Sequence, residues 1–391
     1  MRNQGTWYQR VLDEPVLRLY RRNHRSGFFL SNDNRIYEFD AQGMVQPFAS
    51  RPEFASSEFQ EVLKPLDLPH HSSRRLAVAK SGSQLLVVDG KWIAGEPGQP
   101  GSNCQEVTLL DLLAVEPLLT RRIAEASSVL EDDPFFFLDE ERIGLPPGEF
   151  CIALNARDLT TQAHFHFITQ EFSPPIVMNC LQPHPRGQEF SVGMGEPGWG
   201  VYRRLAVSES GGSILVEQVA EVVFKGQMDL WAVTPSPSGT YAFVFLLNHE
   251  TGLQLPGRPT ANSMAEIGEV VRVDRGGNVE RLTVSGELLD NFCVVDAHLW
   301  TPKRLPPDSY RICPKGPHVG EPQPVLCPVT DEVVLYPTPG GTLLRVDFTA
   351  RKVEVVASLG FAVQALCLLA PEGPLVIAGS EGQFFIIDAI F

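Results

Sequence analysis

The feature that most constrains the fold of this 391-residue chain is a short unit that recurs along its whole length. Each copy consists of a strand that ends in Asp, Asn or Ser, a turn of a few residues, and a second strand. These residue types suit the end of the first strand because their side chains accept hydrogen bonds from the backbone of the turn that they open. The marking residues are Asp40, Asp111, Asn155, Ser208, Asp274, Asp347 and Asp388.

The seventh copy is incomplete, since only three residues follow Asp388. A repeat cannot bury its apolar face alone, so the missing strand has to come from another part of the chain. The segment Thr6–Leu12 at the opposite end is a suitable strand. We therefore expect Thr6–Leu12 to pair beside Phe384–Asp388 and to close a ring of antiparallel sheets, which removes the exposed edges of an open array.

Two further apolar strands precede most copies, separated by turn sequences such as Ser-Gly or Pro-Ser-Gly. Successive marks lie 41 to 73 residues apart. A four-stranded unit takes about forty to fifty residues, so the longer intervals contain insertions. We predict an all-β, single-domain fold of about seven four-stranded blades, although six or eight blades fit the same marks. The predicted blades span 14–49, 72–123, 126–170, 175–220, 227–284, 323–358 and 361–391 with 6–12.

This repeat resembles the β-propeller superfold over essentially the whole chain. The resemblance lies in the spacing of the repeats, because the Gly-His and Trp-Asp dipeptides of the WD40 family and the Kelch pattern are absent. The chain is also similar to the bacterial propellers that are encoded beside MoxR-type ATPases and von Willebrand A proteins. That resemblance implies an accessory subunit of a multi-protein system containing an AAA+ ATPase.

The composition narrows the range of partners. The chain carries 47 acidic and 32 basic residues, a net charge of −15, which repels nucleic acids and anionic membranes. The seven cysteines are scattered, without the close pairs that a structural zinc site or a disulfide framework requires. No apolar run resembles a signal peptide or a membrane span. We expect a cytoplasmic protein that binds neither nucleic acid nor membrane.

The insertions indicate where binding takes place. If the strands of each blade are labelled a to d outward, the b–c turns and the d–a connections to the next blade share one face. Long segments fall mainly in these two classes. The b–c insertions are 89–106, 139–150, 193–202 and 248–269, and the d–a connections are 49–74 and 285–323. Long loops on one side of a rigid scaffold are where binding usually resides.

Six residues in these loops are candidates for contact with a protein partner. Three Gly-Glu-Pro tripeptides predict stiff acidic tips at Glu96, Glu196 and Glu321. The alternative is that they are ordinary turns in a chain rich in glycine and proline. The same loops contain Trp92, Trp199 and Trp300, an aromatic type that is enriched at interfaces. These tryptophans serve equally well as packing between blades.

Motifs for catalysis or cofactor binding are weak. His164 and His166 share one face of a strand, as a metal pair would, but we expect solvated histidines on an outer strand. The carboxylates at 131–133 and 139–141 flank an apolar strand, and we interpret them as charges that protect it from aggregation. We therefore assign no catalytic, metal or cofactor residue. The favoured function is a non-catalytic protein-interaction scaffold, and the alternative is a hydrolase or lyase with its site at the channel mouth.

Overall fold

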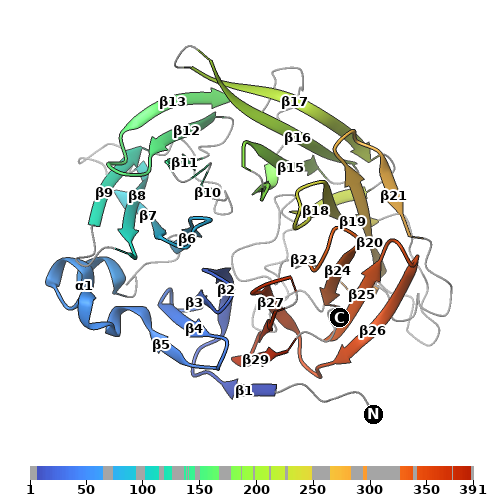
Figure 1. Cartoon of the computed structure of the whole chain (residues 1–391), viewed down its shortest axis with the longest axis horizontal. Helices are drawn as coiled ribbons and strands as arrows, with labels where there is room; N and C mark the ends of the chain where they lie inside the picture. The colour runs from blue at the N-terminus through green and yellow to red at the C-terminus, as the bar shows by residue number, and fades with distance from the viewer. Residues whose placement is uncertain are drawn as a thin grey trace. The chain divides into compact units, whose positions relative to one another are not determined.

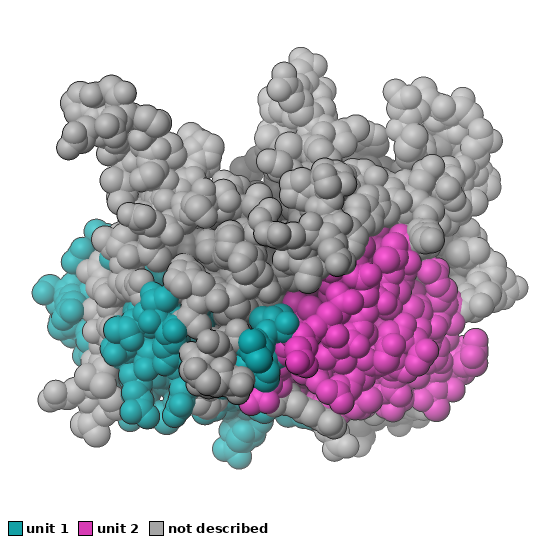
Figure 2. Space-filling model, turned by 90° about the horizontal axis from the view of Figure 1, so that it is seen from above, with its two compact units in different colours: residues 1–169, 207–216, 367–391 teal, residues 170–206, 217–366 magenta. Residues whose placement is uncertain are grey.

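The fold is a seven-bladed β-propeller of antiparallel, mostly four-stranded sheets (Figure 1). The computed structural model describes residues 7–64, 74–93, 102–113, 119–125, 136–137, 139, 141–145, 150–166, 178–185, 187–196, 199–210, 213–224, 228–248, 265–282, 294–296, 326–337, 341–371 and 373–388. The chain forms two compact units, coloured separately in Figure 2. The first comprises residues 1–169, 207–216 and 367–391, and the second comprises 170–206 and 217–366.

The first unit contains three consecutive sheets. Their strands are β2 (Val16–Arg21), β3 (Ser26–Ser31), β4 (Ile36–Asp40) and β5 (Val45–Pro47); β6 (Arg74–Val78), β7 (Gln84–Ile93), β8 (Ser102–Asp111) and β9 (Leu119–Glu125); and β10 (Phe136–Phe137), β11 (Arg142–Leu145), β12 (Phe150–Asn155) and β13 (Thr161–His166). In each sheet, consecutive strands are neighbours, so the spatial order follows the order a to d along the chain.

The closing sheet joins both ends of the chain. It has the order β1-β29-β28-β27, with β1 (Trp7–Val11), β27 (Val363–Leu368), β28 (Leu375–Gly379) and β29 (Gln383–Ile387). Trp7 lies opposite Ile387 and Val11 lies opposite Gln383. The backbone N–H of Leu12 extends this ladder by donating to the carbonyl of Gly382 at 2.8 Å. The predicted closure by the N-terminal strand is therefore confirmed.

The other three sheets belong to the second unit, except for residues 207–216 of β16 and β17, which belong to the first. Their strands are β14 (Met178–Pro183), β15 (Glu189–Glu196), β16 (Trp199–Ser210) and β17 (Ser213–Phe224); β18 (Met228–Pro235), β19 (Tyr241–Asn248), β20 (Ala265–Asp274) and β21 (Val279–Arg281); and β23 (Cys327–Pro328), β24 (Val333–Pro337), β25 (Thr342–Asp347) and β26 (Lys352–Ser358). A fifth strand, β22 (Val294–Asp296), pairs with residues 265–267 of β20.

Where the structure describes the following turn, the marking residues open it as predicted; the residues after Asp388 lie outside the described ranges. Asp40 Oδ1 accepts hydrogen bonds from the N–H groups of Gln42 and Met44, both at 2.9 Å. Asp274 accepts from Gly276 and Asn278 in the same way. Ser208 is the exception, because β16 continues to Ser210 and the strand does not end at the serine. Its identification as a turn-opening residue is wrong, since the two strands are longer than those of the other copies.

Middle strands are buried because their side chains pack against neighbouring sheets of the same unit. All five residues of β24 are buried, and so are all five of β28. In the second unit, Phe245 of β19 stacks on Tyr336 of β24, with ring centroids 5.1 Å apart. This contact joins two neighbouring blades into one apolar core. Such strands form continuous apolar runs in the sequence, which is why they could be located from it.

The sequence assignment of the third blade is wrong. The sequence predicts the segment Pro134–Leu138 as the second strand and 139–150 as a b–c insertion. In the structure, Phe136 and Phe137 form the first strand and β11 is the second. Asp139 belongs to the turn between them: it accepts from the N–H of Glu141 and pairs with Arg142. The range expected to be a b–c insertion therefore contains part of the a–b turn and the second strand, β11.

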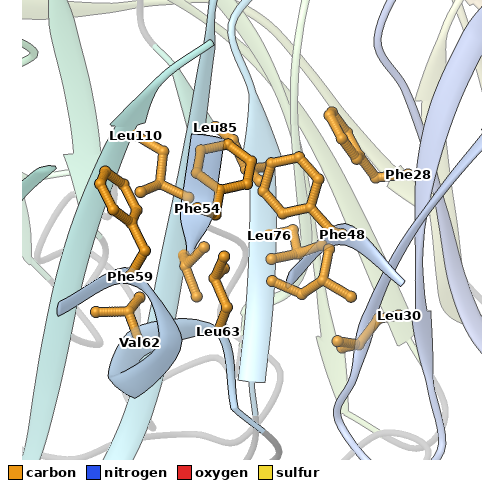
Figure 3. Close-up of a cluster of buried hydrophobic side chains, with 12 residues drawn as sticks. Phe28, Leu30, Phe48, Phe54, Phe59, Val62, Leu63, Leu76, Leu85 and Leu110 are labelled. Atoms are coloured by element: carbon orange, nitrogen blue, oxygen red, sulfur yellow. The ribbon is translucent and has the colours of Figure 1, made fainter. Parts of the chain in front are cut away.

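The connection 49–74 is helical where it is described. Two 3₁₀ helices, Phe48–Ser50 and Pro52–Phe54, precede the α-helix α1 (Ser57–Leu63). Their aromatic residues bury against the first two blades, together with Val62 and Leu63 of α1 (Figure 3). The ring centroids of Phe48 and Phe54 are 4.7 Å apart, and those of Phe54 and Phe59 are 5.2 Å apart. Seven helical residues are too few for a clear sequence signal, so the helix was not predicted.

Candidate interaction face

In each blade the b–c turn and the d–a connection lie at the same end of the strands, which we call the b–c end. Three b–c hairpins are longer than the sequence predicted. Strands β7 and β8 stay paired from Asp89 and Glu106 out to Ile93 and Ser102. Strands β15 and β16 stay paired through the predicted insertion 193–202, and β19 with β20 extends into the insertion 248–269. Part of each of these predicted insertions therefore forms paired β-strand.

The β15–β16 hairpin brings two of the predicted contact residues together. Glu196 lies directly opposite Trp199 in the last pair before the turn. Next to this last pair, a side chain at Gly200 would come within 2.8 Å of Leu230 Cβ and 3.0 Å of Leu230 N. Gly200 therefore permits a close approach between β16 and β18 of the next blade, which sets the position of the hairpin.

Of the other predicted contact residues, the structure describes only Trp92. Trp92 lies on β7 opposite Asn103, in the extended part of the β7–β8 hairpin. Glu96, Trp300 and Glu321 lie outside the described residues. Their assignment as partner-contacting residues stays a prediction, and so does that of Trp92, Glu196 and Trp199.

A buried arginine ties the elements of the b–c end in the first unit. Arg74, at the start of β6, is 2% exposed and makes a bidentate ion pair with Asp89, with both N–O distances 2.8 Å. Its remaining N–H groups donate to backbone carbonyls of Val62 at 2.8 Å, Lys64 at 3.0 Å and Asn34 at 3.2 Å. Val62 and Lys64 form the C-terminal end of α1, where a cation also interacts favourably with the helix dipole.

This arrangement fixes three parts of the b–c end relative to one another. Asn34 belongs to the b–c turn of the first blade, Val62 to the helical connection, and Asp89 to the base of the β7–β8 hairpin. A guanidinium suits the task because it presents five donors in a rigid planar fork. The burial of a charge is tolerable here because Arg74 is fully hydrogen-bonded and paired.

At the opposite end of the strands, the a–b and c–d turns are short. Polar groups in these turns form hydrogen bonds with neighbouring blades. In the second unit, His184 Nδ1 lies 3.2 Å from the Gly239 carbonyl in the a–b turn of the next blade. Asp331 in the a–b turn of the blade after that accepts from the N–H of Ser238 at 3.0 Å and from its hydroxyl. The a–b turns of three successive blades are therefore linked by hydrogen bonds.

The histidine at this end is structural. His184 Nε2 lies 2.8 Å from Ser191 Oγ, which lies 3.2 Å from Tyr202 Oη. Burial, followed by the positive charge of Arg204, lowers the pKa of His184 to about 4, so the ring is neutral. Nδ1–H then donates to Gly239, and Nε2 accepts from Ser191. The serine and the tyrosine are fully buried, so this Ser–His pair cannot reach a substrate.

No site for metal chemistry is found among the described side chains. No group of three or more His, Cys, Asp or Glu residues in that part of the chain is arranged to hold a metal ion. His164 and His166 lie on β13, opposite Ile152 and Phe150, and β13 is the outermost strand of its sheet as expected. No helix in the described ranges is long and apolar enough to span a membrane.

Comparison with known proteins finds similarity of fold only. No family model matches the chain, and no curated protein matches it by sequence. Among solved structures it is similar to "YCF48 bound to D1 peptide", at 11% identity and a TM-score of 0.51, covering 99% of this chain and 98% of that one. It is also similar to Kuenenia stuttgartiensis hydrazine synthase, at 12% identity and 0.56, with 98% of each chain covered.

A third similar structure is the propeller domain of Cps50 (Swd1) from Myceliophteria thermophila. It is 10% identical with a TM-score of 0.53, covering 99% of this chain and all of that domain. Identities this low show the shared architecture. The propeller fold is thus supported by its neighbours as well as by its own sheets.

The sequence did not predict the roles of Arg74 at the b–c end and of His184 at the opposite end of the strands. Arg74 stands beside Arg75 directly after a run of polar residues, which is the appearance of a solvated loop. Its partner Asp89 is the one detectable signal, because an acid after the apolar run 85–88 is costly to bury unless a cation meets it. His184, in His-Pro-Arg-Gly, carries no such signal.

Proposed function

We propose that this protein is a non-catalytic scaffold that binds a protein partner through the b–c end of its blades. The observation that carries the proposal is that, in the described part of the chain, additional ordered structure lies at one end of the strands and not at the other. Among the described residues, extended hairpins and an anchored helix are added at the b–c end. The turns at the other end are short, and His184, Ser238 and Asp331 there bond to neighbouring blades. Ordered additions on one side of a rigid scaffold are typical of binding surfaces.

The neighbouring structures support a protein or peptide ligand. One of them is a complex of YCF48 with a D1 peptide. We extend this kind of ligand to the present chain as part of the proposal. The net charge of −15 favours a partner with a neutral or basic surface. It disfavours nucleic acid and anionic membranes as partners.

The resemblance to propellers encoded beside MoxR-type ATPases suggests a specific kind of partner, an AAA+ ATPase or a von Willebrand A protein. We propose that the protein works in the cytoplasm as an accessory subunit of such an AAA+ and von Willebrand A assembly. Glu96, Glu196 and Glu321, with Trp92, Trp199 and Trp300, are its proposed contact residues.

The test is capture of partners by the tagged full-length protein from its native host, with quantification by mass spectrometry. We expect a stoichiometric protein partner. The variant Glu96→Gln, Glu196→Gln, Glu321→Gln removes three charges at the b–c end and is expected to lower its recovery about tenfold, as loss of charged interface contacts does.

The matched control removes three charges from turns at the opposite end: Glu141→Gln, Asp158→Asn and Glu332→Gln. This variant is expected to recover the partner at the wild-type level. Equal recovery by both triple variants would show that the three glutamates are ordinary turn residues. A wild-type protein recovered alone would overturn the scaffold proposal and turn attention to the hydrolase or lyase alternative.

A further inference from the structure

The outer edge of β17 is the longest exposed strand edge among the described residues. β17 is 12 residues long and is the last strand of its sheet, whose order is β14-β15-β16-β17. No described strand pairs on its outer side. An edge strand offers a row of backbone donors and acceptors to any chain that can lie beside it.

Several other blades have outer strands that are shorter than β17 or irregularly paired. β5 and β21 are three residues long, and β5 ends in Pro47, which has no N–H to donate. β26 carries an irregularity in its pairing with β25, and β13 carries one in its pairing with β12. Short strands, proline and bulges are recognised means of preventing strand addition. The outer strands β9 and β1 are regularly paired but only seven and five residues long, so β17 offers the longest edge for strand addition among the described sheets.

The side chains of β17 give the edge a defined character in the second unit. The residues pointing to one face, Ala220 and Val222, lie against Gly277 in the turn between β20 and β21 of the next blade. The residues of the other face are exposed at Glu217, Glu221 and Val223, the last of which is 43% exposed. Two carboxylates, of which Glu221 also pairs with Arg203 of β16, and an apolar group therefore lie on one face of this outer strand.

A second copy of the same chain fits this edge poorly. In the two-fold antiparallel arrangement centred on Val219, Glu217 of each copy would lie opposite Glu221 of the other. Like charges directly opposite each other destabilise a strand pair. The pattern thus disfavours self-association in that register and favours a strand with positive charges at the facing positions.

We propose that the β17 edge binds an extended segment of a partner protein in which basic residues alternate along the strand and end beside an apolar residue. The bound segment adds a fifth strand to the sheet by backbone hydrogen bonds. Its basic side chains pair with Glu217 and Glu221, and its apolar side chain covers Val223. This site lies on an outer strand and does not depend on partner binding at the b–c end.

The experiment uses the full chain and a labelled heptapeptide, Val-Thr-Lys-Thr-Val-Thr-Lys, with a peptide carrying Glu in place of Lys as the negative probe. Fluorescence polarisation up to about 1 mM protein covers the weak affinities expected of a short strand. We expect the basic peptide to bind and the acidic one not to bind. Amide exchange of residues 213–224 should slow on binding, because strand addition protects the edge amides.

Charge reversal tests the assigned contact. Glu217→Lys is expected to weaken the basic peptide about tenfold and to confer binding of the acidic peptide. Glu381→Lys makes the same change of charge in the exposed turn between β28 and β29, and it should leave both affinities unchanged. Glu221 is left intact because it pairs with the buried Arg203 at 2.7 Å.

Three outcomes would overturn the proposal. One is the absence of binding by the basic peptide, and another is binding that leaves exchange in 213–224 unchanged. The third is a concentration-dependent dimer of the free protein in which the same segment is protected, since that would assign the edge to a second copy.

Discussion

At the scale of single residues, this propeller is held by buried polar groups whose partners come from elsewhere in the chain. Arg74 and Asp89 are 15 positions apart, and His184 and Gly239 are 55 apart. Each buried group is stable only because its hydrogen bonds are made. Removing one partner leaves the other buried without a hydrogen bond, which lowers the free energy of unfolding. A substitution at one such residue therefore destabilises two structural elements.

His184 makes the stability of the protein depend on pH. Its pKa is lowered from 6.5 to about 4 in the folded protein, chiefly by burial. The unfolded chain consequently binds a proton first, so stability is full above pH 6.5 and falls as the pH drops toward 4. The loss is about 3 kcal/mol at its largest. Two charged groups also act on His184: Arg204 lowers its pKa and Glu189 raises it.

The measurement is the urea midpoint of the wild type and of His184→Gln at several pH values between about 7.5 and 4.5, a range that spans the titration of the unfolded histidine. We expect the variant to be less stable at neutral pH, because its buried partners lose hydrogen bonds, and to lose less stability on acidification. His24→Gln, at an exposed turn position, should retain the wild-type slope. Parallel slopes for His184→Gln and the wild type would refute the assignment.

At the scale of elements, the sequence predicted what local chemistry determines. Asp40 and Asp274 open turns through their own side chains, and this is visible in a few consecutive residues. The strand order of the third blade was misjudged because Phe136 and Phe137 fit equally well as a first or a second strand. The helix α1 is too short to give a clear sequence signal, and the residue that anchors it, Arg74, resembles a loop residue.

The contact residues of the b–c end were predicted from loop composition, and the structure shows why that signal is limited. Glu196 and Trp199 were grouped as neighbours in sequence, and strand pairing places them opposite each other. The close approach of Gly200 to Leu230, which positions them, joins two blades. Contacts of this kind leave no pattern in a single segment of sequence.

Arg74→Lys is expected to loosen α1 although the charge is kept. A single ammonium cannot reach both Asp89 oxygens and the carbonyls of Val62 and Lys64, so several buried acceptors lose their donor. The expected cost is about 3 kcal/mol, as for other disrupted buried pairs. Amide exchange of Ser57–Leu63 should rise more than that of β12 in the next blade. Arg35→Lys, at an exposed ion pair with Asp33, is the control and should change neither. Unchanged exchange in α1 would contradict the anchoring role.

At the scale of the whole molecule, one strand completes the seventh blade. The side chains of Gln9, Arg10 and Val11 are exposed, so β1 contributes mainly its backbone ladder to β29 and a few apolar contacts. Tyr8 adds one of these, since its ring occupies the space that a side chain at Gly43 would need. Gly43 lies in the turn between β4 and β5, so β1 contacts the first blade as well as the last.

Deletion of residues 1–12 removes this closure and exposes the edge of β29, which carries buried Phe384 and Ile386. We expect aggregation and a melting temperature lower by roughly 5–10 °C, a loss of a few kcal/mol for a chain of this size. Deletion of residues 1–6 leaves β1 intact and is the control, expected to melt like the full chain. A synthetic peptide of residues 6–12 should partly restore solubility to the longer deletion by occupying the same edge. A 1–12 deletion that stays monomeric with unchanged melting would show that the blade is stable with three strands, and that β1 is a surface addition.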